Sequence, residues 1–410
     1  MASLRLMLFS LCLMCLTCLA TSTTLNQETE FECVSLYTQS ALQHPQMKNH
    51  QIQTKPSREL LSMLSTSNDD TITKIVSEGS EECPKGQVPI HNPKTSVTNN
   101  FIYPQQFTKE GRLLRQDRRV YKRIYKRINN KQRTKTKNIH IYSSTLSQKY
   151  KKHTSKGFRE YNQHYAIIKK FENTTKKWHG AQGLFDINKP RMGQQQYSKA
   201  WIWLNYIQGN VMSSIQFGVA VHTRLYGDDR PRLTTLWMAE KQQNGCYNAL
   251  CPGGYVQVHK SIYPGMVYHK VSVPGGEHHT VHLSVAEDPV TKNWVLTTGT
   301  KMIGYWPRET YMAEGASEVY FGGFAGTSMA QTLSPPMGTG DFPTKDLTRP
   351  SFIKQLKYVL PDYTVVDINS NEIEYYANDP NCYNVMFLKY VDFGSRETLT
   401  FGGPGGHCRL

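Results

Sequence analysis

Residues 213–222, near the middle of the chain, alternate between apolar side chains and small or polar ones. This period of two is typical of a half-buried β-strand. One side of the alternation is apolar throughout: Ile215, Phe217, Val219 and Val221. The other side is small and bare around Gln216. A strand that clears side chains around one polar group lines either a groove or a crowded sheet crossing, and the pattern allows both.

Similar short β-prone runs recur from about His164 onward, separated by glycine, proline, asparagine and aspartate. None of them shows helical periodicity over 12 residues, so we expect an all-β domain over residues 161–410, an antiparallel sandwich or barrel. The runs cover residues 164–171, 180–187, 214–222, 233–237, 255–259, 266–273, 280–286, 294–299, 318–321, 351–357, 382–387 and 398–401.

The first 22 residues have the pattern of a signal peptide. Arg5 precedes an apolar run over residues 6–19, and small residues follow at 20–22. That run is too short for a membrane span, and no later window offers about 18 apolar residues in succession. We therefore expect a secreted protein, extracellular or in the vacuole or apoplast, without a transmembrane segment.

The cysteines agree with export. Of nine cysteines, three lie in the signal segment, and six remain. An even number in an oxidising compartment favours three disulfides over free thiols. None of the pairs has the two-residue spacing of a zinc knuckle, and we expect neither a metal nor a cofactor. Proximity in sequence favours Cys33–Cys83, Cys246–Cys251 and Cys382–Cys408.

The net charge of +16 is concentrated in one segment. Residues 109–159 contain 18 Lys or Arg against only Glu110 and Asp117, which leaves the rest of the chain neutral. We expect a basic linker over 106–160 between a small N-terminal domain (23–105) and the β domain. It fits a disordered connector, a processing site at its dibasic pairs, a short basic helix over 120–128, or a surface that binds acidic polysaccharide. Export argues against a nucleic-acid partner. Asn173 begins a glycosylation sequon.

Several short motifs rich in glycine, proline and cysteine punctuate the chain. In this order they resemble the plant neprosin family, the first motif its activation-peptide domain and the others its catalytic domain. The motifs are Cys33 with Cys83–Ile90, Tyr226–Asp228, Gly245–Gly253, Gly304–Pro307, Met337–Pro343 and Gly402–Gly405.

The resemblance implies a curved antiparallel β-sandwich with a cleft, preceded by a small disulfide-stapled propeptide. It also implies a glutamic endopeptidase zymogen that cleaves at proline in acid, with one glutamate in an Ile-Glu-x-Gly strand and one in a Gly-Gly-Glu strand. One carboxylate would activate water and the other would stabilise the oxyanion.

Both glutamates are replaced in this chain. The first strand has Gln216 and the second has Phe324. An amide can still donate a hydrogen bond, whereas a phenyl ring neither accepts nor gives a proton. Asp341 is the better candidate for a displaced carboxylate, because the family places its loop near the cleft; Glu318 lies too far along the strand from Phe324. Glu277 with His278, His279 and His282 forms another titratable cluster, more simply explained as exposed histidines beside a turn.

Three hypotheses follow. The chain is an inactive pseudo-enzyme that binds a Pro-rich peptide or a glycan in its cleft, an acid peptidase that uses Asp341, or a wall- or surface-binding protein that acts through residues 109–159.

Overall fold

The structure, a computed structural model, describes residues 30–64, 81–92, 161–171, 177–208, 211–239, 244–310, 315–328 and 331–409. It divides into Met1–Glu30, of which only Glu30 is described, and Phe31–Leu410. The expected signal peptide, the basic linker with its helix, and Asn173 all lie outside the described residues. No helix among the described residues is long and apolar enough to cross a membrane.

Strands dominate the larger unit. The helices are short: η1 (Ser40–Gln43), η2 (Pro45–Met47), α2 (Arg58–Leu64), α7 (Thr223–Tyr226) and η4 (Ser370–Glu372). The strands are β1 (Phe31–Ser35), β2 (Gln87–His91), β3 (Tyr161–Phe171), β4 (Gly180–Asp186), β5 (Gln196–Gln208), β6 (Val211–His222), β7 (Arg232–Ala239), β8 (Asn244–Tyr247), β9 (Val256–Gln257), β10 (Thr280–Glu287), β11 (Trp294–Thr298), β12 (Lys301–Trp306), β13 (Glu318–Ser328), β14 (Ser351–Val359), β15 (Val365–Asp367), β16 (Ile373–Ala377), β17 (Asn384–Tyr390) and β18 (Glu397–Gly402).

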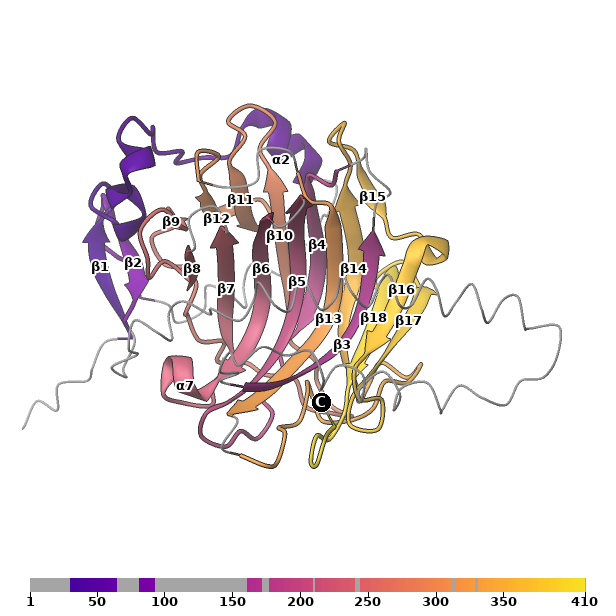
Figure 1. Cartoon of the computed structure of the whole chain (residues 1–410). Helices are drawn as coiled ribbons and strands as arrows, with labels where there is room; N and C mark the ends of the chain where they lie inside the picture. Colours follow the sequence, from indigo (N-terminus) through magenta and orange to yellow (C-terminus); the bar gives the residue numbers. More distant parts are fainter. Residues whose placement is uncertain are drawn as a thin grey trace, which may run out of the picture. The chain divides into compact units, whose positions relative to one another are not determined.

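Two large antiparallel sheets form a sandwich (Figure 1). The seven-stranded sheet has the order β16-β3-β13-β5-β6-β7-β8. The nine-stranded sheet has the order β17-β18-β14-β4-β10-β11-β12-β9, with β15 paired to β14. The main apolar core joins residues of both sheets, such as Phe217 of the first and Phe185 of the second. The predicted all-β antiparallel sandwich is confirmed.

The predicted alternation in β6 is also confirmed. Ile215, Phe217 and Val219 belong to the core between the sheets. Gly218 explains part of the bare opposite side, because a Cβ there would lie 2.0 Å from the carbonyl oxygen of Ala200 and 2.8 Å from the Trp201 ring. The crowded-crossing interpretation therefore holds at this glycine.

One predicted strand is wrong and one long strand was missed. Residues 266–273 form no strand beyond a single bridge between Val267 and Arg232. A turn at Gly265 and backbone bonds to neighbouring loops, such as Tyr268 N–H to the Pro231 carbonyl, prevent a ladder. The missed strand is β5, which lies in the middle of the seven-stranded sheet between β13 and β6.

The N-terminal segment is built into the sandwich by buried hydrogen bonds. The Gln39 side-chain amide donates to the Gln257 carbonyl oxygen and accepts from the Gln257 N–H, both at 2.8 Å. The Gln53 amide donates to Asp288 at 2.7 Å and accepts from Asn293 at 2.8 Å. Apolar side chains add to these bonds, since Ala41, Leu60 and Leu64 share a cluster with β11, β12 and β14.

All three predicted disulfides are confirmed. Each closes within its own part of the chain, because the bonded residues are 50, 5 and 26 positions apart. Cys33–Cys83 ties the loop after η2 and α2 to the β1–β2 pair.

Candidate functional site

The predicted site residues lie on the side of the seven-stranded sheet that faces away from the nine-stranded sheet. We call this the outer face; it carries the odd-numbered residues of β3 and β5, the even-numbered residues of β6, β7 and β13, and Tyr247 of β8. A second apolar cluster covers much of it, including Trp201, Trp203 and Phe324. Most of these side chains are buried in the full chain.

Gln216 is fully buried on the outer face. Its amide nitrogen donates to the Ser214 hydroxyl at 3.1 Å, and that hydroxyl donates to the Asn205 oxygen at 2.6 Å. Its own oxygen, Oε1, is buried and has no hydrogen-bond partner among the residues that the structure describes. Leaving such an acceptor unpaired typically costs about 1–3 kcal/mol.

Phe324 lies in a group of aromatic rings. Its ring stacks on Tyr165 with centroids 4.5 Å apart, and Tyr197 lies 5.1 Å away. The Trp203 ring is edge-on at 6.3 Å. The Phe324 ring itself can neither move a proton nor orient water.

The sheet register does not bring Gln216 and Phe324 opposite each other. Across β5, Phe324 pairs with Lys199, whereas Gln216 pairs with Trp203, four residues further along. Two strand spacings and four residues place their Cα atoms roughly 16 Å apart. Glu318 lies nearer to Gln216, because it pairs with Asn205 and Asn205 pairs with Ser214. That register gives a Cα separation of roughly 12 Å.

Lys199 occupies the centre of the outer face and was missed in the sequence. It is only 1% exposed, and its ammonium donates to the Tyr247 hydroxyl at 2.9 Å. Four aromatic rings surround the ammonium, with centroids 4.1 to 5.3 Å away: Trp201, Tyr197, Tyr247 and Phe324. A buried cation thus stands beside the position where the family resemblance implies a carboxylate.

Further cations lie along the same line. Ala220 pairs with Lys199 on one side and with Arg232 on the other. Arg232 is 1% exposed and donates to Asp228 at 2.7 Å. Burial raises the pKa of Asp228, but the bonds from Arg230 and Arg232 outweigh it and the pKa is lowered.

The pKa of His222 is also affected by these positive charges. Burial lowers its pKa well below the ordinary value, and the charges of Lys199 and Arg224 lower it further. Its ring nitrogen Nδ1 accepts from the Leu225 N–H at 3.3 Å, which fits a neutral ring. This end of the outer face therefore disfavours additional positive charge.

Asp341 is not joined to this face by any contact among the described residues. Its carboxylate pairs with Arg349 at 3.1 Å. The loop begins at Met337, which packs against Gly323, and Gly323 points to the opposite side of β13 from Phe324. We therefore give Asp341 no role beside Gln216.

A Ser-His-Asn group lies elsewhere and does not form a nucleophile. His164 Nε2 is 3.1 Å from the Ser334 hydroxyl, and its Nδ1 is 3.2 Å from the amide nitrogen of Asn378. Asn378 is oriented by the Tyr165 N–H, which its oxygen accepts at 2.7 Å. Nδ1 is thus the acceptor and Nε2 carries the proton, so the ring cannot take a proton from Ser334.

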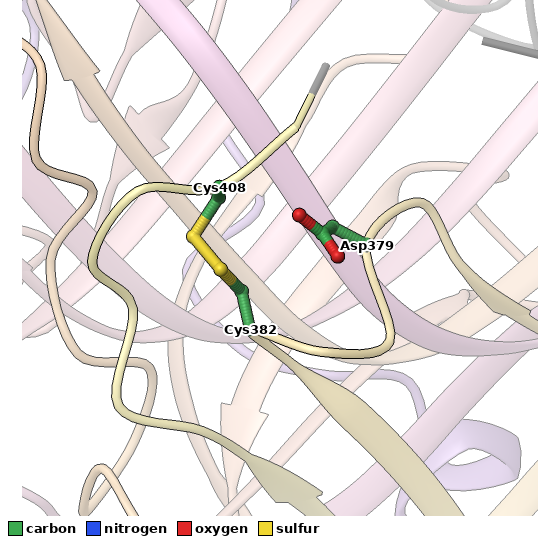
Figure 2. A group of neighbouring side chains, drawn as sticks. All are labelled: Asp379, Cys382 and Cys408. Atoms are coloured by element: carbon green, nitrogen blue, oxygen red, sulfur yellow. A yellow bond between two sulfur atoms is a disulfide. The ribbon is translucent and has the colours of Figure 1, made fainter. Parts of the chain in front are cut away.

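The remaining titratable clusters are structural. His278 lies 3.3 Å from Asp186, whose hydrogen bond raises its pKa. Figure 2 shows Asp379 beside Cys382 and Cys408, whose sulfurs are joined in a disulfide and are not available as thiolate ligands. Asp379 instead accepts the Arg409 N–H and caps the end of the chain.

Comparisons with known proteins give two family matches. The family model described as neprosin matches residues 194–404, and the neprosin activation peptide matches residues 27–169. The second match extends through the basic linker into β3.

Solved structures similar to this chain include scytalido-glutamic peptidase with a transition state analog inhibitor, at 8% identity and a TM-score of 0.31, covering 60% of this chain and 99% of that one. SCP-B, of the eqolisin family of peptidases, in a complex with the tripeptide Ala-Ile-His, has 9% identity and a TM-score of 0.29, covering 60% of this chain and 98% of that one. The neprosin model alone spans more than half of the 410 residues, and the chain belongs to the neprosin family.

Proposed function

We propose that this chain is an exported, peptidase-like member of the neprosin family that binds a peptide on its outer face and does not hydrolyse it. The observation that carries the proposal is the setting of Phe324, stacked on Tyr165 and 5.3 Å from the Lys199 ammonium. A glutamic peptidase needs a carboxyl group that exchanges protons there. This position offers an apolar ring and a neighbouring cation.

The size of the rate contribution made by a catalytic acid or base supports the proposed loss of catalysis. A positioned acid or base typically contributes about 10²- to 10⁴-fold to the rate, and groups that act together fail together. Gln216 keeps a hydrogen-bonding amide but has no carboxyl group, and Ser214 accepts one of its two N–H donors. The outer face retains aromatic area and polar atoms suited to holding a ligand.

The test is peptide cleavage by the purified full-length chain between pH 3 and 7, with Pro-containing peptides followed by mass spectrometry. We expect no cleavage at any pH. The assay is repeated after limited cleavage within residues 106–160, which mimics processing at the dibasic pairs of this segment. An active peptidase of the same family run in parallel shows that the peptides and conditions are suitable. Turnover by the natural chain would contradict the proposal.

A displaced carboxylate is the second candidate function, and the register favours Glu318 for it. Glu318 is buried, accepts a hydrogen bond from the Tyr320 hydroxyl, and lies beside Asn205 in the line that leads to Gln216. If the natural chain cleaves peptides, Glu318→Gln should abolish turnover. Asp341→Asn is the matched control and should leave it unchanged. The opposite pattern would favour Asp341.

A further inference from the structure

The hairpin between β17 and β18 carries a dense group of exposed apolar side chains. Nine large apolar side chains are exposed among the described residues, and three of them lie within four positions of this hairpin. Tyr390 is 54% exposed, Val391 40% and Phe393 86%. Single apolar residues are ordinary on a protein surface, whereas a contiguous group of them marks an interaction site. We call residues 390–393 the aromatic tip.

Hydrogen bonds fix the loop that carries the aromatic tip. The Arg396 N–H donates to the Asp392 carbonyl at 2.7 Å and closes the loop. Gln355 of β14 donates its N–H to the Ser395 carbonyl and its side-chain amide to the Gly394 carbonyl, both at 2.9 Å. The tip is therefore held in place by a neighbouring strand, and little ordering is needed when it binds a partner.

The acidic side chains of this hairpin are not free at the tip. Asp392 accepts from the Ser395 N–H at 2.6 Å and from the Ser395 hydroxyl at 3.2 Å, and Ser395 itself is buried. Asp367 of β15 pairs with Arg396 at 2.5 Å. Burial, and then the charge of Asp367, raise the pKa of Glu397. Each acid is thus bonded to the loop, paired with arginine, or raised in pKa.

Two lysines lie next to the tip. Lys389 is exposed and forms no ion pair with any described residue. Lys354 lies over the Phe352 ring, 4.3 Å from its centroid, and the charge of Asp392 acts on it. An exposed cation beside an apolar tip suits a surface that offers phosphate groups together with hydrocarbon.

The form and size of the tip favour a lipid bilayer over a protein. A side chain as exposed as Phe393 projects from the surface and does not line a groove. The exposed parts of the three apolar side chains amount to roughly 400 Å², since aromatic side chains bury about 150–250 Å² each. Each partner in a stable protein complex contributes about 800 Å². A bilayer needs no matching pocket, because projecting aromatic and aliphatic side chains enter the region between headgroups and acyl chains.

We propose that the aromatic tip inserts into the interfacial region of a phospholipid bilayer, with Lys389 beside the headgroup phosphates. Attachment of this kind needs no membrane-spanning helix. The inference does not depend on peptide binding at the outer face, because it concerns a different surface, at the edge of the nine-stranded sheet.

Insertion is measured by tryptophan fluorescence of the full-length Phe393→Trp variant. The vesicles contain phosphatidylcholine and phosphatidylserine at about 7:3, and the phosphatidylcholine is brominated on its acyl chains. Bromine quenches tryptophan on contact, and all six natural tryptophans are at most 3% exposed, so quenching reports on position 393. We expect Trp at position 393 to be quenched. Tyr37→Trp is the matched control, because Tyr37 is also strongly exposed but lies on another loop, and no quenching is expected there.

Affinity is measured by sedimentation with the same vesicles, unbrominated, in about 0.5 M NaCl, which screens the attraction of the basic segment 109–159. Phe393→Ser should weaken binding at least about tenfold, because a phenyl ring gains far more than a hydroxymethyl group from leaving water. Tyr37→Ser should leave binding unchanged. Since Phe393 is exposed, its replacement should also leave the urea midpoint of unfolding unchanged, which separates lost binding from lost folding.

The contrary results are specific. Absence of quenching at position 393, or equal quenching at position 37, would overturn the inference, as would sedimentation that Phe393→Ser leaves unchanged. A dimer of the natural chain that Phe393→Ser converts to a monomer, seen by sedimentation velocity without vesicles, would overturn it in favour of a second copy of the chain. Binding of polygalacturonate through Phe393, with no binding of vesicles, would overturn it in favour of an acidic polysaccharide.

Discussion

Cutting the chain within residues 106–160 is expected to leave the N-terminal segment bound to the sandwich. Its only disulfide, Cys33–Cys83, is internal, so retention has to be non-covalent. The contacts are those of a protein interior: Leu60 is 0% exposed and packs in a cluster with β11 and β12, and Gln53 is bonded to Asp288 and Asn293. We therefore expect the N-terminal segment to stay bound after the cut.

The measurement is size-exclusion chromatography of the cut protein at pH 7, followed by a denaturing gel. Both fragments should elute together. Leu60→Ala should weaken their association, because emptying a buried leucine site costs about 2–5 kcal/mol, or roughly 30- to 4,000-fold in the dissociation constant. Leu61→Ala is the matched control: the same substitution at a half-buried site outside the cluster, where little change is expected. If the N-terminal fragment separates from the cut protein that carries no substitution, the prediction is contradicted.

The sequence predicts the sandwich because its signals are local. Proximity identified all three disulfides, and alternation identified β6 with its apolar side toward the core. β5 was not predicted, because both of its sides are buried. Its sequence therefore contains a continuous apolar run without alternation: Trp201, Ile202, Trp203 and Leu204. Length and flanking signals alone separate such a strand from a buried helix.

The missed strand is also why half of the site was missed. Lys199 is the one charged residue at a buried position of β5. From the sequence alone, a lysine is expected to be exposed to solvent. Motifs give the positions of Gln216 and Phe324 but not their register. The four-residue offset between them is set by how β5 pairs with β13 and β6, and this long-range pairing leaves no local pattern.

Acid is expected to destabilise the fold through His164. Burial lowers its pKa from 6.5 to about 4, against the weaker opposing charge of Asp379. Protonation would place a hydrogen on Nδ1, which faces the amide nitrogen of Asn378 at 3.2 Å, so the charged ring loses its acceptor role. The neutral form is therefore the one that the folded chain holds.

The direction of the pH dependence follows from the number of protons that the folded and unfolded chains bind. Between about pH 6.5 and 4 the unfolded chain binds a proton at His164 that the folded chain excludes, so the free energy of unfolding falls as the pH falls. The full loss is about 3 kcal/mol, from 1.36 kcal/mol for each pKa unit.

His222, His179 and His259 also have lowered pKa values, so the pH dependence of the natural chain's stability does not by itself isolate one residue. His164→Gln does, because it keeps polar atoms at the site without titrating. Urea unfolding of both proteins at pH 7, 6, 5 and 4 should show the variant less stable at pH 7 and the gap closing toward pH 4. Parallel profiles would show that His164 is not held neutral by the fold, and that its contact with Asn378 is not acid-sensitive.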